Sequence, residues 1–68
     1  MNQYERILKY ISDYGSISPY EAFADLGITK LSTRISEMRA DGIDFSQEWE
    51  VHKNRYGEKV RYMRYSRG

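Results

Sequence analysis

Apolar residues recur at helical spacing in the N-terminal part of the chain. One stripe with the spacing i, i+3, i+4 and i+7 consists of Tyr4, Ile7, Leu8 and Ile11. This stripe predicts a first helix over about residues 2–14. Asn2 is suited to cap its start, because the side chain can accept a hydrogen bond from a backbone N–H of the first turn. Gly15 is suited to end it, since glycine adopts positive φ without a Cβ clash.

The stretch SPYE predicts the start of a second helix, over about residues 19–26. Ser18 is expected at the N-cap and Pro19 at the first helical position, where the fixed φ of proline already suits a helix. Glu21 then completes a capping box with Ser18, because each side chain can bond the backbone of the other residue. The inward side of this helix is expected to carry Ala22, Phe23 and Leu26.

A third helix is predicted over about residues 30–41, capped by Thr29 and ended by Gly42. Its apolar stripe consists of Ile28, Leu31, Ile35 and Met38. Only the short link LGIT separates it from the second helix. Two short helices with such a link have the spacing of a helix-turn-helix, in which the second helix is the reading element.

After the third helix the apolar period changes to two, which predicts an antiparallel hairpin over about residues 45–65. One face of its first strand consists of Phe45, Gln47, Trp49 and Val51. A loop of two or four residues around NRYG places this face beside Val60 and Tyr62, because the two registers differ by two residues. On the other face the same pairing makes Glu50 and Arg61 cross-strand neighbours.

A two-stranded hairpin is only marginally stable by itself in water, so the Trp49 face is expected to pack on the helices. Trp49 is therefore assigned to the core, and His52 to the surface beside Arg61. Ile17, between the first two helices, is expected to add one bridge to the sheet. The predicted fold class is α+β, with three helices followed by a two-stranded antiparallel wing hairpin, the architecture of a winged helix-turn-helix in a single domain over residues 1–68.

Composition narrows the range of functions. The 68-residue chain contains no cysteine and one histidine, His52, which excludes a disulfide framework, a thiolate metal site and a histidine-rich zinc centre. The sequence has no nucleophile–base–orienter pattern and no glycine-rich phosphate loop after a strand. We therefore expect no enzyme activity, no catalytic residue, no metal, no cofactor and no small-molecule substrate. No apolar run approaches the roughly 20 residues of a membrane span, so we expect no membrane association.

Positive charge is concentrated in the C-terminal part of the chain. The formal net charge is only +1. Residues 1–44 carry 5 basic and 7 acidic side chains, a net charge of −2, whereas residues 45–68 carry 6 and 3, a net charge of +3. Charge on a thin ribbon is not diluted by a large body, so the predicted hairpin is expected to attract phosphate.

The order of these elements resembles the small winged helix-turn-helix domains of many phage, prophage and mobile-element proteins. The blocks that carry the resemblance are RILKYI, GSISPYEAFADLGI, LSTRISEMRADG and NRYGEKVRYMRY. The resemblance implies a recognition helix over residues 30–39 and a wing tip over residues 55–59. It also implies double-stranded DNA as the partner, and transcription regulation or an architectural role in the cytoplasm of a bacterium or phage-infected host. One departure is that Glu37 and Asp41 make the third helix less basic than a strong major-groove reader.

Five side chains of the third helix are candidates for contacting DNA. They lie on or beside the side of the helical wheel that points away from the apolar stripe, and they are Lys30, Thr33, Arg34, Ser36 and Glu37. Lys or Arg can donate to guanine, Thr can contact a thymine methyl group, and Glu can accept from cytosine. Three interpretations stay open: base reading, phosphate positioning alone, and a solvated or protein-facing surface on which Arg34 pairs with Glu37.

The predicted wing supplies a second set of DNA-binding candidates, namely Lys53, Arg55, Tyr56, Lys59 and Arg61. Arg55 at the tip is placed to enter a minor groove. Lys53 and Lys59 are placed on either side of the backbone, and Tyr56 can bond a phosphate or stack. The alternative is that cations on an exposed strand edge only prevent edge-to-edge aggregation.

Two functions remain open on the sequence alone. The first is binding to double-stranded DNA, where a single small domain buries so little area that a homodimer, tandem sites or a partner protein is expected. The second is a winged-helix module that binds and modulates a host protein. The net negative charge of residues 1–44 and the mixed charge of the third helix favour this alternative.

Overall fold

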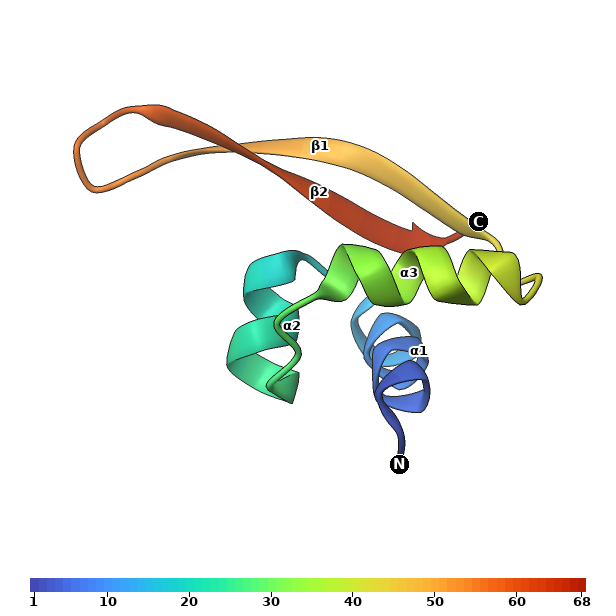
Figure 1. The fold of residues 1–68 in the computed structure, drawn as a ribbon. Helices are drawn as coiled ribbons and strands as arrows, with labels where there is room; N and C mark the ends of the chain where they lie inside the picture. The colour runs from blue at the N-terminus through green and yellow to red at the C-terminus, as the bar shows by residue number, and fades with distance from the viewer.

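Three helices are followed by a two-stranded antiparallel hairpin in the computed structural model, which describes all 68 residues (Figure 1). The elements are α1 (Gln3–Tyr14), α2 (Pro19–Leu26), α3 (Leu31–Ala40), β1 (Phe45–Lys53) and β2 (Lys59–Arg67). The predicted fold class is confirmed. Strand β2 continues two residues beyond the predicted end of the hairpin, and α3 is one residue shorter at each end than predicted. No helix is long and apolar enough to cross a bilayer.

Local hydrogen bonds define the starts of the first two helices as the sequence predicted. Asn2 Oδ1 accepts a 2.8 Å hydrogen bond from the backbone N–H of Glu5. The capping box of α2 is complete, because Glu21 N–H donates to Ser18 Oγ at 3.2 Å and Ser18 N–H donates to Glu21 Oε1 at 3.0 Å. The cap predicted for α3 is wrong: Lys30, and not Thr29, occupies the N-cap position, and it makes no side-chain capping bond.

The substitution Ser18→Ala is expected to lower the free energy of unfolding by about 1 kcal/mol, because it leaves a backbone donor of α2 without its cap. Urea denaturation followed by circular dichroism measures this change. Ser12→Ala, at an exposed position within α1, is the matched control and is expected to stabilise slightly, since alanine is the better helix former. Equal midpoints for the two variants would contradict the prediction.

The core lies where the three helices and the base of the hairpin meet. Its nine buried hydrophobic residues are Ile7, Ile11, Ile17, Ala22, Ile28, Leu31, Ile35, Met38 and Tyr65. The prediction that Phe23 points inward is wrong, because this side chain is 60% exposed. Ala22 is fully buried, and the next residue of a helix points about 100° away from it, which carries Phe23 to the outer side of α2.

The hairpin register differs from the predicted one by a single residue. Trp49 lies opposite Met63 and Glu50 lies opposite Tyr62, so the predicted pairings of Trp49 with the Val60 face and of Glu50 with Arg61 are wrong. His52 is on the surface as predicted, but it lies opposite Val60.

The shape of the tip explains this shift. The backbone N–H of Gly57 donates to Asn54 O at 3.0 Å, and the N–H of Asn54 donates to Glu58 O at 2.8 Å. Gly57 has φ of 77°, the left-handed conformation that follows a type I turn in a three-residue hairpin loop. An odd number of loop residues turns every side chain of one strand to the opposite face relative to an even number.

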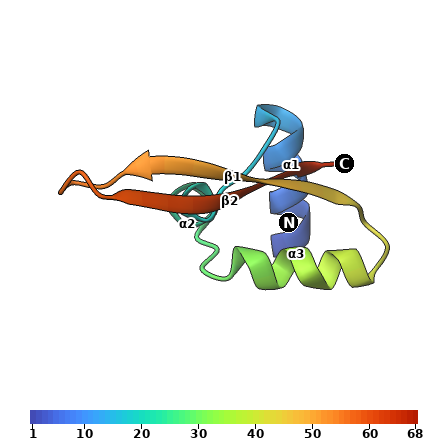
Figure 2. The same ribbon diagram turned by 90° about the horizontal axis from the view of Figure 1, so that it is seen from above.

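Tyr65, and not Trp49, anchors the hairpin to the helices. Tyr65 is 7% exposed, and its backbone forms an antiparallel bridge with Ile17, the bridge that the sequence predicted. The assignment of Trp49 to the core is wrong, because 59% of this residue is exposed. The strands extend past α2 into solvent in both views (Figures 1 and 2), and the molecule accordingly measures 39 Å along its longest axis and 21 Å along the others.

Candidate nucleic-acid interface

The outer side of α3 carries small polar side chains. Lys30, Thr33 and Ser36 are exposed, together with Ser32 and Ala40. They are exposed because Leu31, Ile35 and Met38 take the opposite side of the helix into the core. Small side chains allow another surface to approach the helix closely, as a recognition helix requires in a major groove.

Arg34 and Glu37 are turned towards α1 and bonded within the protein. Arg34 Nε donates to Gln3 Oε1 at 2.8 Å, and Arg34 Nη1 donates to Glu37 Oε1 at 2.6 Å. The Tyr4 hydroxyl donates to the same carboxylate oxygen at 2.9 Å. The guanidinium of Arg34, and then the Tyr4 hydroxyl, hold the pKa of Glu37 below its ordinary value. The predicted DNA contacts of these two residues stay predictions, and forming them requires breaking this network.

The hairpin, called the ribbon below, has two chemically different faces. We define the cationic face by the residues that share it beyond the core: Trp49, Val51, Lys53, Lys59, Arg61 and Met63. It carries three cations and no carboxylate. The opposite face, called the α2 face, consists of Glu48, Glu50, His52, Val60, Tyr62 and Arg64.

Four cations of the ribbon form no salt bridge, and they are Lys53, Arg55, Lys59 and Arg61. All four are exposed, and Lys53 lies directly opposite Lys59. Like charges directly opposite each other destabilise a strand pair. A bound polyanion removes this repulsion, so the arrangement favours phosphate as a ligand.

Arg64 belongs to the α2 face and is used inside the protein. Its Nη1 donates to Glu21 Oε1 at 2.8 Å and to Ser16 Oγ at 3.0 Å, while its Nε donates to Glu50 Oε2. The bond with Glu50 is the largest cause of the raised pKa of Arg64, and the Arg64 and His52 side chains in turn lower the pKa of Glu50. This network joins both strands of the ribbon to the start of α2 and fixes the direction in which the ribbon leaves the core.

The cationic face continues towards α3. Arg39 of α3 donates through Nη2 to Gln47 Oε1 at 2.8 Å and to Phe45 O at 3.2 Å. Gln47 shares its side of β1 with Trp49, because alternate residues of a strand point the same way. Figure 2 shows α3 alongside the base of the ribbon, while the far end of the ribbon extends past α2. At the base, the side of β1 that carries Gln47 therefore borders α3, and Arg64 of the opposite face meets Glu21 of α2.

The structure thus brings three of the predicted wing residues onto one face and leaves the other two at the tip. Lys53, Lys59 and Arg61 share the cationic face, and Arg55 and Tyr56 lie in the exposed loop. The sequence analysis missed Trp49 as a member of this surface because of the register. The pattern N-R-Y-G, with Asn first and Gly fourth in a type I turn, is the signal that indicates the odd loop.

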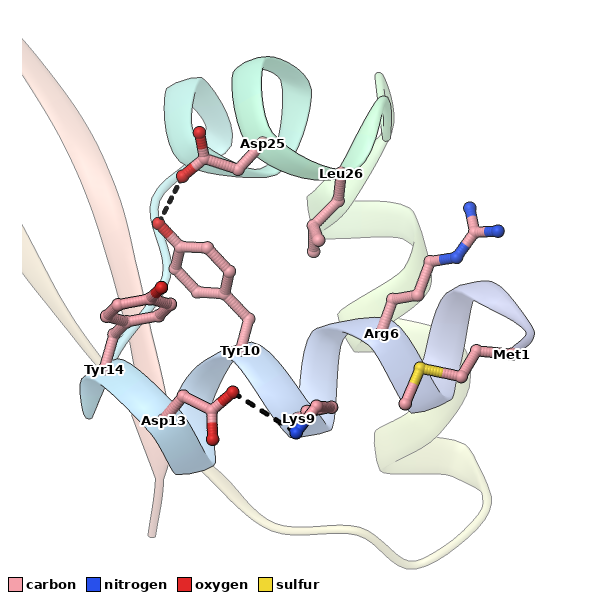
Figure 3. A pocket seen from close by; sticks show the side chains of 8 residues that line it. All are labelled: Met1, Arg6, Lys9, Tyr10, Asp13, Tyr14, Asp25 and Leu26. Carbon is pink, nitrogen blue, oxygen red and sulfur yellow. Dashed lines mark hydrogen bonds and ion pairs between the residues drawn. The ribbon is translucent and has the colours of Figure 1, made fainter.

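A separate hollow of about 380 Å³ lies between α1 and α2 (Figure 3). Tyr10 donates from its hydroxyl to Asp25 Oδ2 at 2.6 Å, and this bond raises the pKa of Tyr10 to about 12. The Tyr14 ring lies beside Tyr10, with 4.6 Å between the ring centroids. The hollow contains none of the predicted DNA contacts.

Comparison with known protein families gives one match. A family model described as a winged helix-turn-helix domain matches residues 2–66, which is nearly the whole chain. No curated protein and no solved structure matches the chain significantly.

Proposed function

Since the chain belongs to the winged helix-turn-helix domain family, we propose that it binds double-stranded DNA through α3 and the cationic face of the ribbon. The observation that carries this proposal is the pair Lys53 and Lys59, which are opposed and exposed at the far end of the ribbon and form no salt bridge with a carboxylate. Phosphate contacts from such cations supply most of the affinity of a small domain for duplex DNA.

In this arrangement α3 enters the major groove and the ribbon follows the flanking backbone. Lys30 and Thr33 lie at the exposed start of α3, where Lys can donate to guanine and Thr can contact the methyl group of thymine. The loop that contains Arg55 extends beyond α2 (Figure 1), and we expect Arg55 to reach the next groove. Base contacts therefore come from α3, and positioning contacts come from the ribbon.

The biological role that we propose is that of a transcriptional regulator or architectural factor, in the phage or mobile-element setting that the sequence resemblance implies. A single copy offers a limited contact area, and specific sites in DNA are commonly occupied by two copies on two half-sites. We therefore propose that two copies act together on neighbouring half-sites, either as a homodimer or on tandem sites.

Titration of a labelled mixed-sequence duplex between about 50 and about 200 mM salt tests the proposal. The logarithm of the association constant is expected to fall linearly with the logarithm of salt concentration, with a slope near −3.6 if four cations contact phosphates. Selection from random duplexes should then give a motif that Thr33→Ala changes while overall affinity for mixed DNA stays similar. Absence of binding even at the lowest salt would contradict DNA binding.

A second candidate function is protein binding, and the exposed aromatic residues of α2 favour it. Tyr20 is 72% exposed and Phe23 is 60% exposed, and both lie on α2. Large exposed apolar side chains are enriched in protein interfaces. If this function holds, Phe23→Ala weakens capture of a host protein from lysate and leaves DNA affinity unchanged.

A further inference from the structure

We propose that Trp49 and Arg61 form a stacking site for an unpaired DNA base next to the duplex held by α3. The inference deepens the proposed function and rests on it for the position of the duplex. It adds a different ligand feature, because a stacked base is recognised by its aromatic face, whereas the backbone of a duplex is recognised by its charge.

The first step is the exposure of the indole. Trp49 is the single tryptophan of the chain, and it lies on the ribbon beyond the core with 59% of its surface exposed. Tyr65, two positions towards the core from Met63, already provides the apolar anchor of this face. Trp49 is therefore not needed to hold the ribbon on the helices, and its ring is accessible to a ligand.

The second step is the group that accompanies the ring. The guanidinium carbon of Arg61 lies 5.0 Å from the centroid of the Trp49 ring, within the range of a cation–π contact. Arg61 lies over one side of the ring, and the 59% exposure of Trp49 leaves the ring accessible to a base. A base that stacks on it brings its phosphate close to a cation, and aromatic rings combined with such cations are the usual components of single-strand binding surfaces.

The third step is the charge around the ring. The cationic face carries Lys53, Lys59 and Arg61 and no carboxylate, whereas Glu48 and Glu50 point to the other face. An acidic protein segment would pair with the cations of this face but not with the ring. An uncharged segment would contact the ring but not the cations. A nucleotide uses both at once, because it presents an aromatic base and an anionic phosphate to neighbouring parts of the face.

The fourth step is the position relative to α3. Gln47, which precedes Trp49 on the same side of β1, bonds Arg39 of α3 at 2.8 Å. A duplex seated on α3 therefore places its flanking nucleotides over the ribbon near Trp49. The expected ligand is DNA with a paired segment and an adjoining unpaired base, such as a duplex with a single-stranded extension or a duplex opened by bending.

Two DNA probes test this inference, a blunt mixed-sequence duplex and the same duplex with a short single-stranded extension. Anisotropy of a label on the DNA reports binding, and emission of Trp49 reports stacking because no other tryptophan contributes. The extended duplex is expected to bind at least about fivefold more tightly than the blunt duplex and to quench the emission. Trp49→Ala should abolish this preference, so that the two probes bind with equal affinity. Phe23→Ala removes an aromatic side chain of nearly equal exposure, 60%, and should keep both the preference and the quenching.

The possible results separate the two proposals. Equal affinity for both probes with unchanged Trp49 emission, or a preference that survives Trp49→Ala, overturns the stacking site and leaves duplex binding intact. Binding and quenching with the extended probe alone supports the stacking site and overturns the proposed function. Binding to neither probe overturns both.

Discussion

The double substitution Lys53→Gln and Lys59→Gln is expected to weaken binding to duplex DNA roughly 50-fold at about 0.1 M salt. Each lost phosphate contact removes about 0.9 from the magnitude of the salt slope, so the slope should fall by about 1.8. Stability should move in the opposite direction. The two ammonium groups oppose each other across the ribbon, and their removal is expected to raise the free energy of unfolding by a few tenths of a kcal/mol.

Arg6→Gln with Lys9→Gln is the matched control, because it removes the same charge from α1. Helix α1 lies beneath the base of the ribbon, and the end of the ribbon where β1 stops at Lys53 and β2 starts at Lys59 extends away from it (Figures 1 and 2). Its two exposed cations are therefore expected to change affinity by only about twofold, through the long-range field that salt screens. Titrations of both variants over the same salt series compare the two sites. Equal weakening by the two double variants would show that net charge, and not this face, governs binding.

Tyr65→Ala is expected to lower the free energy of unfolding by about 3–5 kcal/mol, the cost of removing a large buried aromatic side chain. A domain of 68 residues has roughly 3–10 kcal/mol of stability in total, so this variant should be largely unfolded near its physiological temperature. The loss is large because the Tyr65 ring lies in the core and its strand is bridged to Ile17. Thermal and urea denaturation followed by circular dichroism measure the effect.

Two variants make this prediction specific to the observed register. Tyr65→Phe keeps the ring and is expected to change stability by less than about 0.5 kcal/mol. Trp49→Ala is expected to cost no more than about 1 kcal/mol, because the residue is mostly exposed and loses only neighbours within the ribbon, such as Arg61 and Met63. If Trp49→Ala proved as damaging as Tyr65→Ala, Trp49 would be a core residue and the register would be wrong.

The parts of the fold that depend on neighbouring residues could be predicted from the sequence. Ser18 and Glu21 are three residues apart, and their bonds form wherever this segment becomes helical. The stripe that ends in Ile35 and Met38 needed only the period of a helix. These features are decided within one or two turns, so tertiary packing did not change them.

The wrong predictions concern which side of a helix or strand faces the core, and the local sequence does not decide this. Phe23 and Ala22 are neighbours on a short helix, and which of them faces α1 is set by the packing angle of α2. The face of the ribbon on which Trp49 lies depends on whether the loop has an odd or an even number of residues. Arg64 is one of the six basic residues of the positively charged C-terminal part, yet it meets Glu21, 43 positions earlier, which no local pattern indicates.

The predicted contacts on α3 show the same limit. Thr33 and Ser36 are exposed, as the helical wheel indicates. Arg34 and Glu37 form the pair that one of the open interpretations predicted, and they also meet Gln3 and Tyr4, which lie more than 30 positions earlier in the chain. Helical spacing gives the direction in which a side chain leaves its own helix, but it does not give the neighbour that stands there.

The odd number of residues in the loop of the hairpin also limits how the length of this loop can vary. Phe45 and Tyr65 both face the core, and Lys53 and Lys59 share their side of the ribbon because the loop contains an odd number of residues. Inserting or deleting one residue between Asn54 and Glu58 would turn one strand over, so Tyr65 and Lys59 would leave the side that carries Phe45 and Lys53. The core anchor and the cationic face would then be lost together, so functional variants of this segment should differ in length by two residues at a time.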